Sequence, residues 1–173
     1  MKRALPALVL VLVAGGVAGG VLASCGTDPK ECADMASAAL AKGDTAEALK
    51  CAEAGLKEPS VAGDSATSWR LERVRLEALA MKGDSAVVLS DIQRLGKTYP
   101  AQVTADVYAK LSRELMDAGK GVESLQLVEA GKKLFPDHAT AFDEHIAALK
   151  KKAEAGDNAL LQQLQNLGYV GGK

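Results

Sequence analysis

The sequence predicts an all-α protein built from stacked antiparallel helix pairs, and two observations lead to this prediction. The first is composition: of 173 residues, 48% are hydrophobic, 25% are charged and 3% are aromatic. That is enough apolar mass for a core, but β-sandwiches and barrels depend more on β-branched and aromatic residues. The second is a glycine that recurs between amphipathic helical patterns, at spacings of 40, 36 and 37 residues. Repeated helix–turn–helix units are therefore expected.

The charge balance argues against nucleic-acid binding. Lys and Arg number 21 and Asp and Glu number 22, which gives a net charge of −1. A nucleic-acid-binding protein normally carries a basic excess that neutralises phosphates. We therefore expect no nucleic-acid partner.

Residues 1–24 have the layout of a secretory signal peptide. Lys2 and Arg3 form a short positive region, and residues 4–22 are apolar and uncharged. A membrane-spanning anchor is the alternative, because the apolar run approaches the roughly 20 residues that a bilayer requires. Proline and paired glycines within the run lower its helix propensity, which favours the signal peptide.

The segment Leu-Ala-Ser-Cys at residues 22–25 resembles the bacterial lipobox, in which a small residue precedes a cysteine. The resemblance implies a lipidated Cys25 and a short tether over residues 25–29, with several acyl chains holding the protein on a bilayer. Gly26 follows the cysteine in place of an aspartate. For a Gram-negative source, this implies the periplasmic face of the outer membrane.

Each helix pair is expected to turn at a glycine, because glycine adopts the left-handed conformation that ends a helix at little cost. An aspartate follows three of these glycines and can cap the next helix. Prolines 59, 100 and 136 are expected to close the units. The predicted helices are 30–42 and 44–57, 66–82 and 84–98, 101–118 and 120–134, and 138–155 and 157–167.

A helix pair cannot cover its own apolar face, so neighbouring pairs are expected to stack. The repeat domain then covers residues 30–167 with about four pairs, and residues 168–173 form a C-terminal tail. Glycines end the last helix. We expect Tyr169 and Val170 to fold back over the open end of the stack, and Trp69 to seal the first pair against the second.

The second helices share a pattern of a turn glycine, small or apolar residues and a closing proline. It recurs as Gly43, Ala48, Ala52, Leu56 and Pro59; as Gly83, Leu89, Ile92, Tyr99 and Pro100; and as Gly119, Leu125, Val128, Phe135 and Pro136. This pattern resembles the tetratricopeptide repeat family over nearly all of residues 30–167, and an irregular helical bundle is the alternative. The first helices fit less well, because Ser112 alone is small at the close-contact position, where Leu76 and Leu149 stand in other pairs.

The resemblance implies a right-handed superhelix whose first helices line a concave groove for a peptide or partner protein. Mapping by the turn glycines gives a mixed groove with a basic lean, suited to an acidic or extended segment. A surface with ordinary charges is the alternative. The implied groove residues are Arg70, Arg73, Glu77, Met81, Lys110, Arg113, Met116 and Lys150.

If Cys25 carries lipid, Cys32 and Cys51 remain. In a hairpin that turns at Gly43 they lie at nearly equal height on the two helices. A bridge between them would close a loop of about 20 residues and stabilise the fold by about 3 kcal/mol. Two buried thiols packed between helices are the alternative.

No catalytic motif is evident in the sequence, and no cofactor is expected. The expected function is a non-enzymatic, lipid-anchored adaptor for a protein or peptide partner, without a small-molecule substrate. A self-associating envelope protein is the second hypothesis. The third is a metal carrier or enzyme using His138 and His145, which are seven residues apart and can share a helix face; solvated or capping residues are the alternative for this pair.

Overall fold

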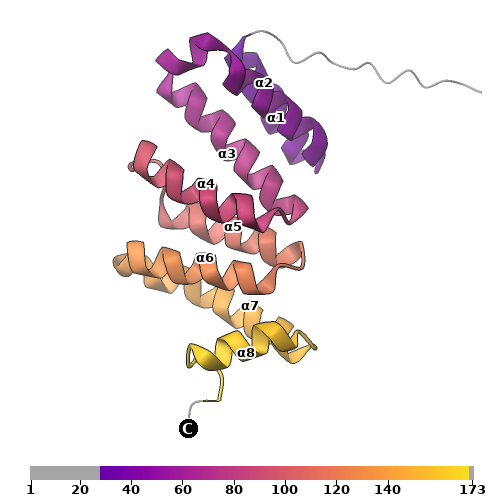
Figure 1. Ribbon diagram of the computed structural model, residues 1–173, viewed down its shortest axis with the longest axis vertical. Helices are drawn as coiled ribbons and strands as arrows, with labels where there is room; N and C mark the ends of the chain where they lie inside the picture. The colour runs from indigo at the N-terminus through magenta and orange to yellow at the C-terminus, as the bar shows by residue number, and fades with distance from the viewer. Residues whose placement is uncertain (1–27, 172–173) are drawn as a thin grey trace, which may run out of the picture.

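The computed structural model describes residues 28–171, which fold as eight α-helices and two short 3-10 helices with no β-strand (Figure 1). This confirms the all-α prediction. The α-helices are α1 (Pro29–Ala41), α2 (Thr45–Lys57), α3 (Ser65–Lys82), α4 (Ser85–Thr98), α5 (Ala105–Asp117), α6 (Gly121–Leu134), α7 (Asp143–Glu154) and α8 (Asn158–Asn166); the 3-10 helices are η1 (Pro59–Gly63) and η2 (Pro136–Phe142).

The predicted signal peptide (residues 1–24) and the predicted lipidation site at Cys25 lie outside the described residues. Within residues 28–171, none of the helices combines the length and apolarity needed to cross a membrane.

The turns between paired helices lie at the predicted glycines. Gly43 and Gly83 have φ angles of +77° and +78°, in the left-handed region that side chains other than glycine rarely enter. Asp44 then accepts a hydrogen bond from the backbone N–H of Glu47 at 3.0 Å and so caps α2. The turn therefore combines a backbone conformation suited to glycine with a carboxylate that satisfies the next helix terminus.

Two helices, α5 and α7, begin several residues later than predicted. The chain after Pro100 makes a turn in which Val103 is buried, and α5 starts at Ala105. The chain after Pro136 forms η2, which carries Phe142 into the core before α7 starts at Asp143. In both places the connecting segment contributes a buried side chain, so it is part of the packing.

Helix pairs follow one another along the long axis of the molecule (Figure 1). Helix α1 packs against α2 and α3, α3 packs against α4 and α5, and α5 packs against α6 and α7. The second helices also meet, since α4 contacts α6 and α6 contacts α8. The first helix of each pair therefore lies beside the first helix of the next.

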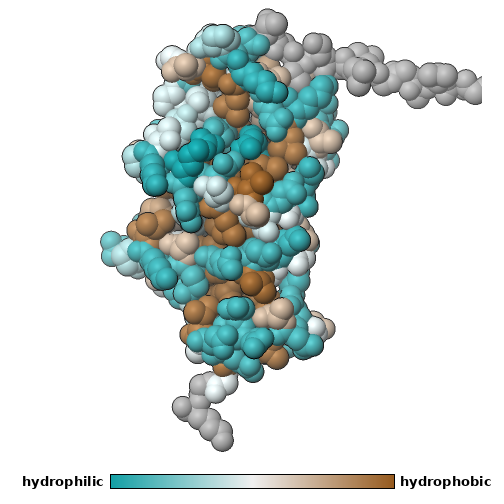
Figure 2. Space-filling view, in the orientation of Figure 1, coloured by the Kyte–Doolittle hydropathy of each residue, from teal (hydrophilic) through white to brown (hydrophobic). Residues whose placement is uncertain are grey.

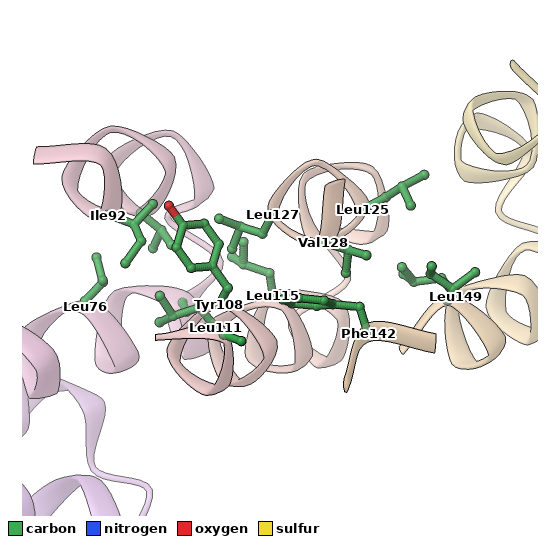
Figure 3. Close-up of a cluster of buried hydrophobic side chains, with 14 of the residues drawn as sticks. Leu76, Ile92, Tyr108, Leu111, Leu115, Leu125, Leu127, Val128, Phe142 and Leu149 are labelled. Atoms are coloured by element: carbon green, nitrogen blue, oxygen red, sulfur yellow. The ribbon is translucent and has the colours of Figure 1, made fainter. Parts of the chain in front are cut away.

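The core consists of two clusters that share α3. Leu71, Val74 and Ala78 of α3 join the cysteines and alanines of α1 and α2 in an N-terminal cluster. Leu76 and Leu79, on other faces of α3, belong to the main cluster that runs through α4 to α8. Figure 3 shows this main cluster, with Tyr108, Leu111 and Leu115 of α5 at its centre.

Small residues bring the helices of a pair together. Ser112 of α5 is fully buried, and its Oγ lies 2.9 Å from Oγ of Ser124 on α6. Ser124 also donates to the backbone carbonyl of Ser112 at 2.7 Å. Ser112 therefore lies in close contact with α6, whereas Leu76 and Leu149, which stand at the corresponding sequence positions, are buried as large side chains.

The C-terminal tail folds back, as predicted. Tyr169 and Val170 pack against the main cluster. The hydroxyl of Tyr169 donates to Glu129 Oε1 at 2.5 Å and accepts from Lys132 Nζ at 3.0 Å, both on α6. The tail therefore returns to α6 of the preceding pair, and covering of the open end of the stack stays a prediction.

Candidate functional site: a groove along α1, α3 and α5

The first helices of three successive pairs form one continuous surface, because α3 contacts both α1 and α5. Two adjoining hollows lie on this surface. The first has a volume of about 300 Å³ and the second of about 280 Å³, and Arg73, Glu77 and Lys110 line both of them. We refer to this pair of hollows as the A-face groove.

The first hollow lies between α1, α3 and α5, and its lining combines apolar and charged side chains. Its remaining lining residues are Ser37, Leu40, Ala41, Val74, Met81 and Glu114. The second hollow lies between the start of α3 and α5 and is more polar. Its remaining lining residues are Trp69, Gln102, Thr104, Asp106 and Val107.

Glu77 divides the two hollows. Only 5% of it is exposed, and its two carboxylate oxygens have separate partners. Lys110 Nζ donates to Oε2 at 2.7 Å, and Arg73 Nε lies 3.5 Å from Oε1. A buried carboxylate requires such partners because removing a charge from water is costly. The two cations are therefore committed to the protein itself and are less available to a bound anion.

Glu114 also lines the first hollow. Burial raises the pKa of its carboxyl, Lys110 lowers it, and the negative charges of Glu77 and Asp117 raise it again. Glu114 makes no ion pair within 4.0 Å among residues 28–171. It is a carboxylate that a donor on a bound segment could reach.

The structure brings together four of the predicted groove residues, namely Arg73, Glu77, Met81 and Lys110, around the first hollow. Arg70 lies outside the linings of both hollows, and its Nη2 donates to Asp34 on α1 at 2.7 Å. Arg73 and Lys110 are each paired with Glu77. The groove therefore carries less unpaired positive charge than the sequence suggested.

The other three predicted groove residues lie further along the stack. Arg113 and Met116 line a separate small hollow between α5 and α7. Lys150 of α7 lies with its Nζ 5.9 Å from the centre of the Tyr169 ring, near the C-terminal tail. The structure therefore distributes the predicted set over three places.

Sequence reasoning missed the contribution of α1. Ser37 precedes Gly43 by six residues, as Glu77 precedes Gly83 and Arg113 precedes Gly119. The turn-glycine mapping that identified Glu77 and Arg113 would have identified Ser37 as well, had it been extended to the first pair.

Trp69 has a different partner from the one predicted. Its ring lies 5.5 Å from the ring of Tyr99, at the end of α4, and it packs against the main cluster. It therefore joins α3 to α4 in the second pair and leaves the contact with the first pair to Leu71 and Val74.

The two histidines are in different environments. His138 is exposed on η2, whereas His145 on α7 is only 6% exposed. Burial, and then the charge of Arg113, lower the pKa of His145, and its hydrogen bond with the backbone of Ala109 opposes them. Within the described residues, no group of three or more His, Cys, Asp and Glu side chains is arranged to hold a metal ion.

Cys32 and Cys51 are fully buried in the N-terminal cluster, on the two helices of the first pair. Nearby, a Cβ added to Gly55 of α2 would lie 2.8 Å from Cβ of Cys32, so these helices approach closely. Burial fits both alternatives, and the disulfide stays a prediction. Intact mass measured after alkylation, with and without prior reduction, distinguishes the two.

Two more apolar hollows lie on the opposite side, between the second helices. One of about 400 Å³ lies between α4 and α6, beside Leu134, which is 61% exposed. The other, of about 370 Å³, lies between α6 and α8, beside Leu167, which is 47% exposed. Figure 2 shows this side of the molecule, with apolar patches between the polar surfaces of the helices.

No protein-family model matches this chain, and comparisons with curated proteins and with solved structures find no match either.

Proposed function

We propose that this chain is a non-enzymatic scaffold of tetratricopeptide-like helix pairs that binds an extended segment of a partner protein in the A-face groove. The observation that carries the proposal is the row of first helices α1, α3 and α5, whose adjoining faces are hollowed around Glu77. An extended segment can cross several helices of such a row and contact each of them.

The divided groove also suggests how a segment would lie. An apolar side chain fits the first hollow, where Leu40, Val74 and Met81 are among the lining residues. Backbone amides and polar side chains fit the second hollow, with its threonine, glutamine and aspartate. The recognition would then combine buried apolar contact with a few polar contacts, as in other interfaces.

The test is site-specific photo-crosslinking in the native cell. A photoreactive amino acid replaces Met81 in the groove, and a matched control replaces exposed Lys50 on the outside of α2. We expect a discrete crosslinked species from position 81 that is missing from position 50. Equal products from both positions, or none from position 81, would reject the groove.

We also propose that the chain is held at the bacterial envelope by lipid on Cys25, at the periplasmic face of the outer membrane in a Gram-negative source. The support is the lipobox-like segment at residues 22–25. Labelled palmitate should be incorporated into the wild-type protein and not into Cys25→Ser. Incorporation that survives this substitution would overturn the assignment.

Self-association is the alternative function, and light scattering on the purified chain decides it. A monomer at micromolar concentration favours the scaffold, and a stable oligomer favours a structural envelope protein.

A further inference from the structure

We propose that the small hollow between α5 and α7 is a carboxylate-binding subsite, which takes an aspartate or glutamate side chain, or a chain end, of the bound partner. The inference rests on the proposed function and adds a defined ligand chemistry in the separate hollow that follows the A-face groove along the row of first helices. The hollow has a volume of about 160 Å³ and is lined by Arg113, Met116, Glu144, His145 and Ala148.

Arg113, the cation of this subsite, forms no ion pair with an acidic side chain among residues 28–171. Arg70, Arg73 and Lys110 each form an ion pair with an acidic side chain of the protein. Arg113 is exposed and has no acidic oxygen within 4.0 Å among residues 28–171. A guanidinium presents parallel N–H donors that match a carboxylate in a two-point contact. Of the predicted groove cations on α3 and α5, Arg113 is therefore the one that a partner anion can use without displacing an internal partner.

His145 supplies the second observation. The side chain is more than nine-tenths buried, and Nε2 lies beneath the surface without a hydrogen-bond partner. Buried polar side-chain atoms normally have a hydrogen-bond partner, so Nε2 of His145 is an unsatisfied polar atom beside this hollow. The other ring nitrogen of His145 is hydrogen-bonded to the backbone of Ala109, so Nε2 carries a proton, and can donate it to a carboxylate oxygen, only in the imidazolium form.

The charges around His145 fix the sign of the pH dependence. Arg113 on α5 disfavours the imidazolium and so lowers the pKa of His145, whereas Glu144 on its own helix raises it. A carboxylate bound to Arg113 adds a negative charge beside the ring and raises the pKa of His145. By linkage, ligand binding then takes up a proton, and affinity increases as the pH falls through the range in which His145 titrates.

Glu144 acts as a competitor. Its exposed carboxylate lines the same hollow, but it makes no ion pair with Arg113. Its negative charge opposes the approach of a second carboxylate. Glu144→Gln should therefore increase the affinity for an anionic ligand, which is the opposite of what a merely structural role for this residue would produce.

The experiment is a proton NMR titration of the full chain, whose only two histidines are His138 and His145. The probe is N-acetyl-glutamate N-methylamide, and the control ligand is its uncharged glutamine counterpart. We expect the glutamate probe, and not the glutamine compound, to raise the pKa of His145, and we expect neither compound to perturb the ring signals of exposed His138 at a given pH. Affinity for the probe should rise on the order of threefold from neutral to mildly acidic pH, the effect of two unit charges several ångströms apart in water.

Variants complete the test. Arg113→Gln should abolish binding of the probe, Glu144→Gln should strengthen it, and His145→Gln should remove the pH dependence. An unchanged His145 signal, an equal response to the glutamine compound, or unaltered binding by Arg113→Gln would each overturn the subsite. A crosslink at position 81 combined with any of these results would leave the proposed function standing and reject only the subsite.

Discussion

Gly131 shows how tightly the stack is packed at the scale of a single residue. A Cβ at this position of α6 would lie 2.5 Å from Cζ of Phe142 and 3.2 Å from Cβ of Tyr108. Both neighbours belong to the main cluster and are almost completely buried, so they have little space to move into. Gly96 of α4 is a contrasting helical glycine, because a Cβ there would meet no atom within 4 Å.

The first prediction compares these two glycines. Gly131→Ala should reduce the free energy of unfolding by about 1–3 kcal/mol, because it overpacks a filled site. Gly96→Ala should increase it by about 0.5–1 kcal/mol, because alanine costs less than glycine in a helix interior. Urea unfolding followed by circular dichroism measures both. Equal effects from the two substitutions would show that helix propensity, and not the contact with Phe142, controls the result.

At the scale of the element, the structure separates two N-terminal aspartates that look alike in the sequence. Asp44 accepts a hydrogen bond from the backbone of Glu47. Asp84 stands at the same place before α4 but makes no capping bond, and its carboxylate lies 3.4 Å from Lys82 Nζ. The Gly-Asp pair therefore predicts the turn correctly in both places. The predicted capping bond forms at Asp44 and does not form at Asp84.

The second prediction follows from this difference. Asp44→Ala should cost about 1 kcal/mol of stability, the usual value for a lost N-cap. Asp84→Ala loses only an exposed ion pair and should change stability by less than about 0.5 kcal/mol. Thermal unfolding of the two variants under identical conditions gives the comparison, and a larger loss from Asp84→Ala would contradict it.

The C-terminal tail is a second element with a testable contact. Tyr169 is hydrogen-bonded to Glu129 and Lys132 of α6, so the third prediction is that Tyr169→Phe loosens the last helix pair by about 1 kcal/mol. Hydrogen exchange should become faster in α8 and remain unchanged in α1 and α2.

Tyr99→Phe is the matched control, because the Tyr99 hydroxyl lies 2.6 Å from Ser68 Oγ in the second pair. It should speed exchange around α3 and α4 and leave α8 alone. Uniform changes along the chain from either variant would show that exchange reports global unfolding.

At the scale of the whole molecule, stability is divided between two clusters joined by α3. Leu71 belongs to the N-terminal cluster and Leu149 to the main one, and both are fully buried. In repeat proteins stability is close to a sum of unit and nearest-neighbour terms, so damage to one region is felt first by its neighbours.

The fourth prediction is that Leu71→Ala and Leu149→Ala unfold opposite ends of the stack. Each should cost about 2–5 kcal/mol locally, as expected for a large core side chain. Leu71→Ala should reduce hydrogen-exchange protection in α1 and α2, and Leu149→Ala in α7 and α8. Loss of protection along the whole chain from either variant would indicate a single cooperative unit.

The sequence predicted the features that local physics controls. Turn glycines and helical periodicity depend on neighbouring residues, so helices near their predicted ranges could be expected. The late starts of α5 and α7 could not be predicted in this way. A proline marks a helix boundary, but it does not show how many residues the chain needs to bury Val103 or Phe142.

The candidate site was less predictable because its charges meet across helices. Lys110 reaches Glu77 from 33 residues away, and this pairing depends on how α3 and α5 lie against each other. A list of cations on the first helices therefore overstated the positive charge available to a partner. His145 illustrates the same limit, since its burial against α5 follows from where α7 begins and not from its seven-residue spacing to His138.

Helix α3 has a mechanical consequence. Its 18 residues anchor the N-terminal cluster on one side and the main cluster on the other. A pull applied at the N-terminal end of the domain would be transmitted to α4–α8 mainly through α3, with Leu49 of α2 as a smaller contact to the main cluster. The order of unfolding under force would then depend on how strongly Leu71 and Leu76 pack in their separate clusters. The first helix pair would unfold before the rest of the stack.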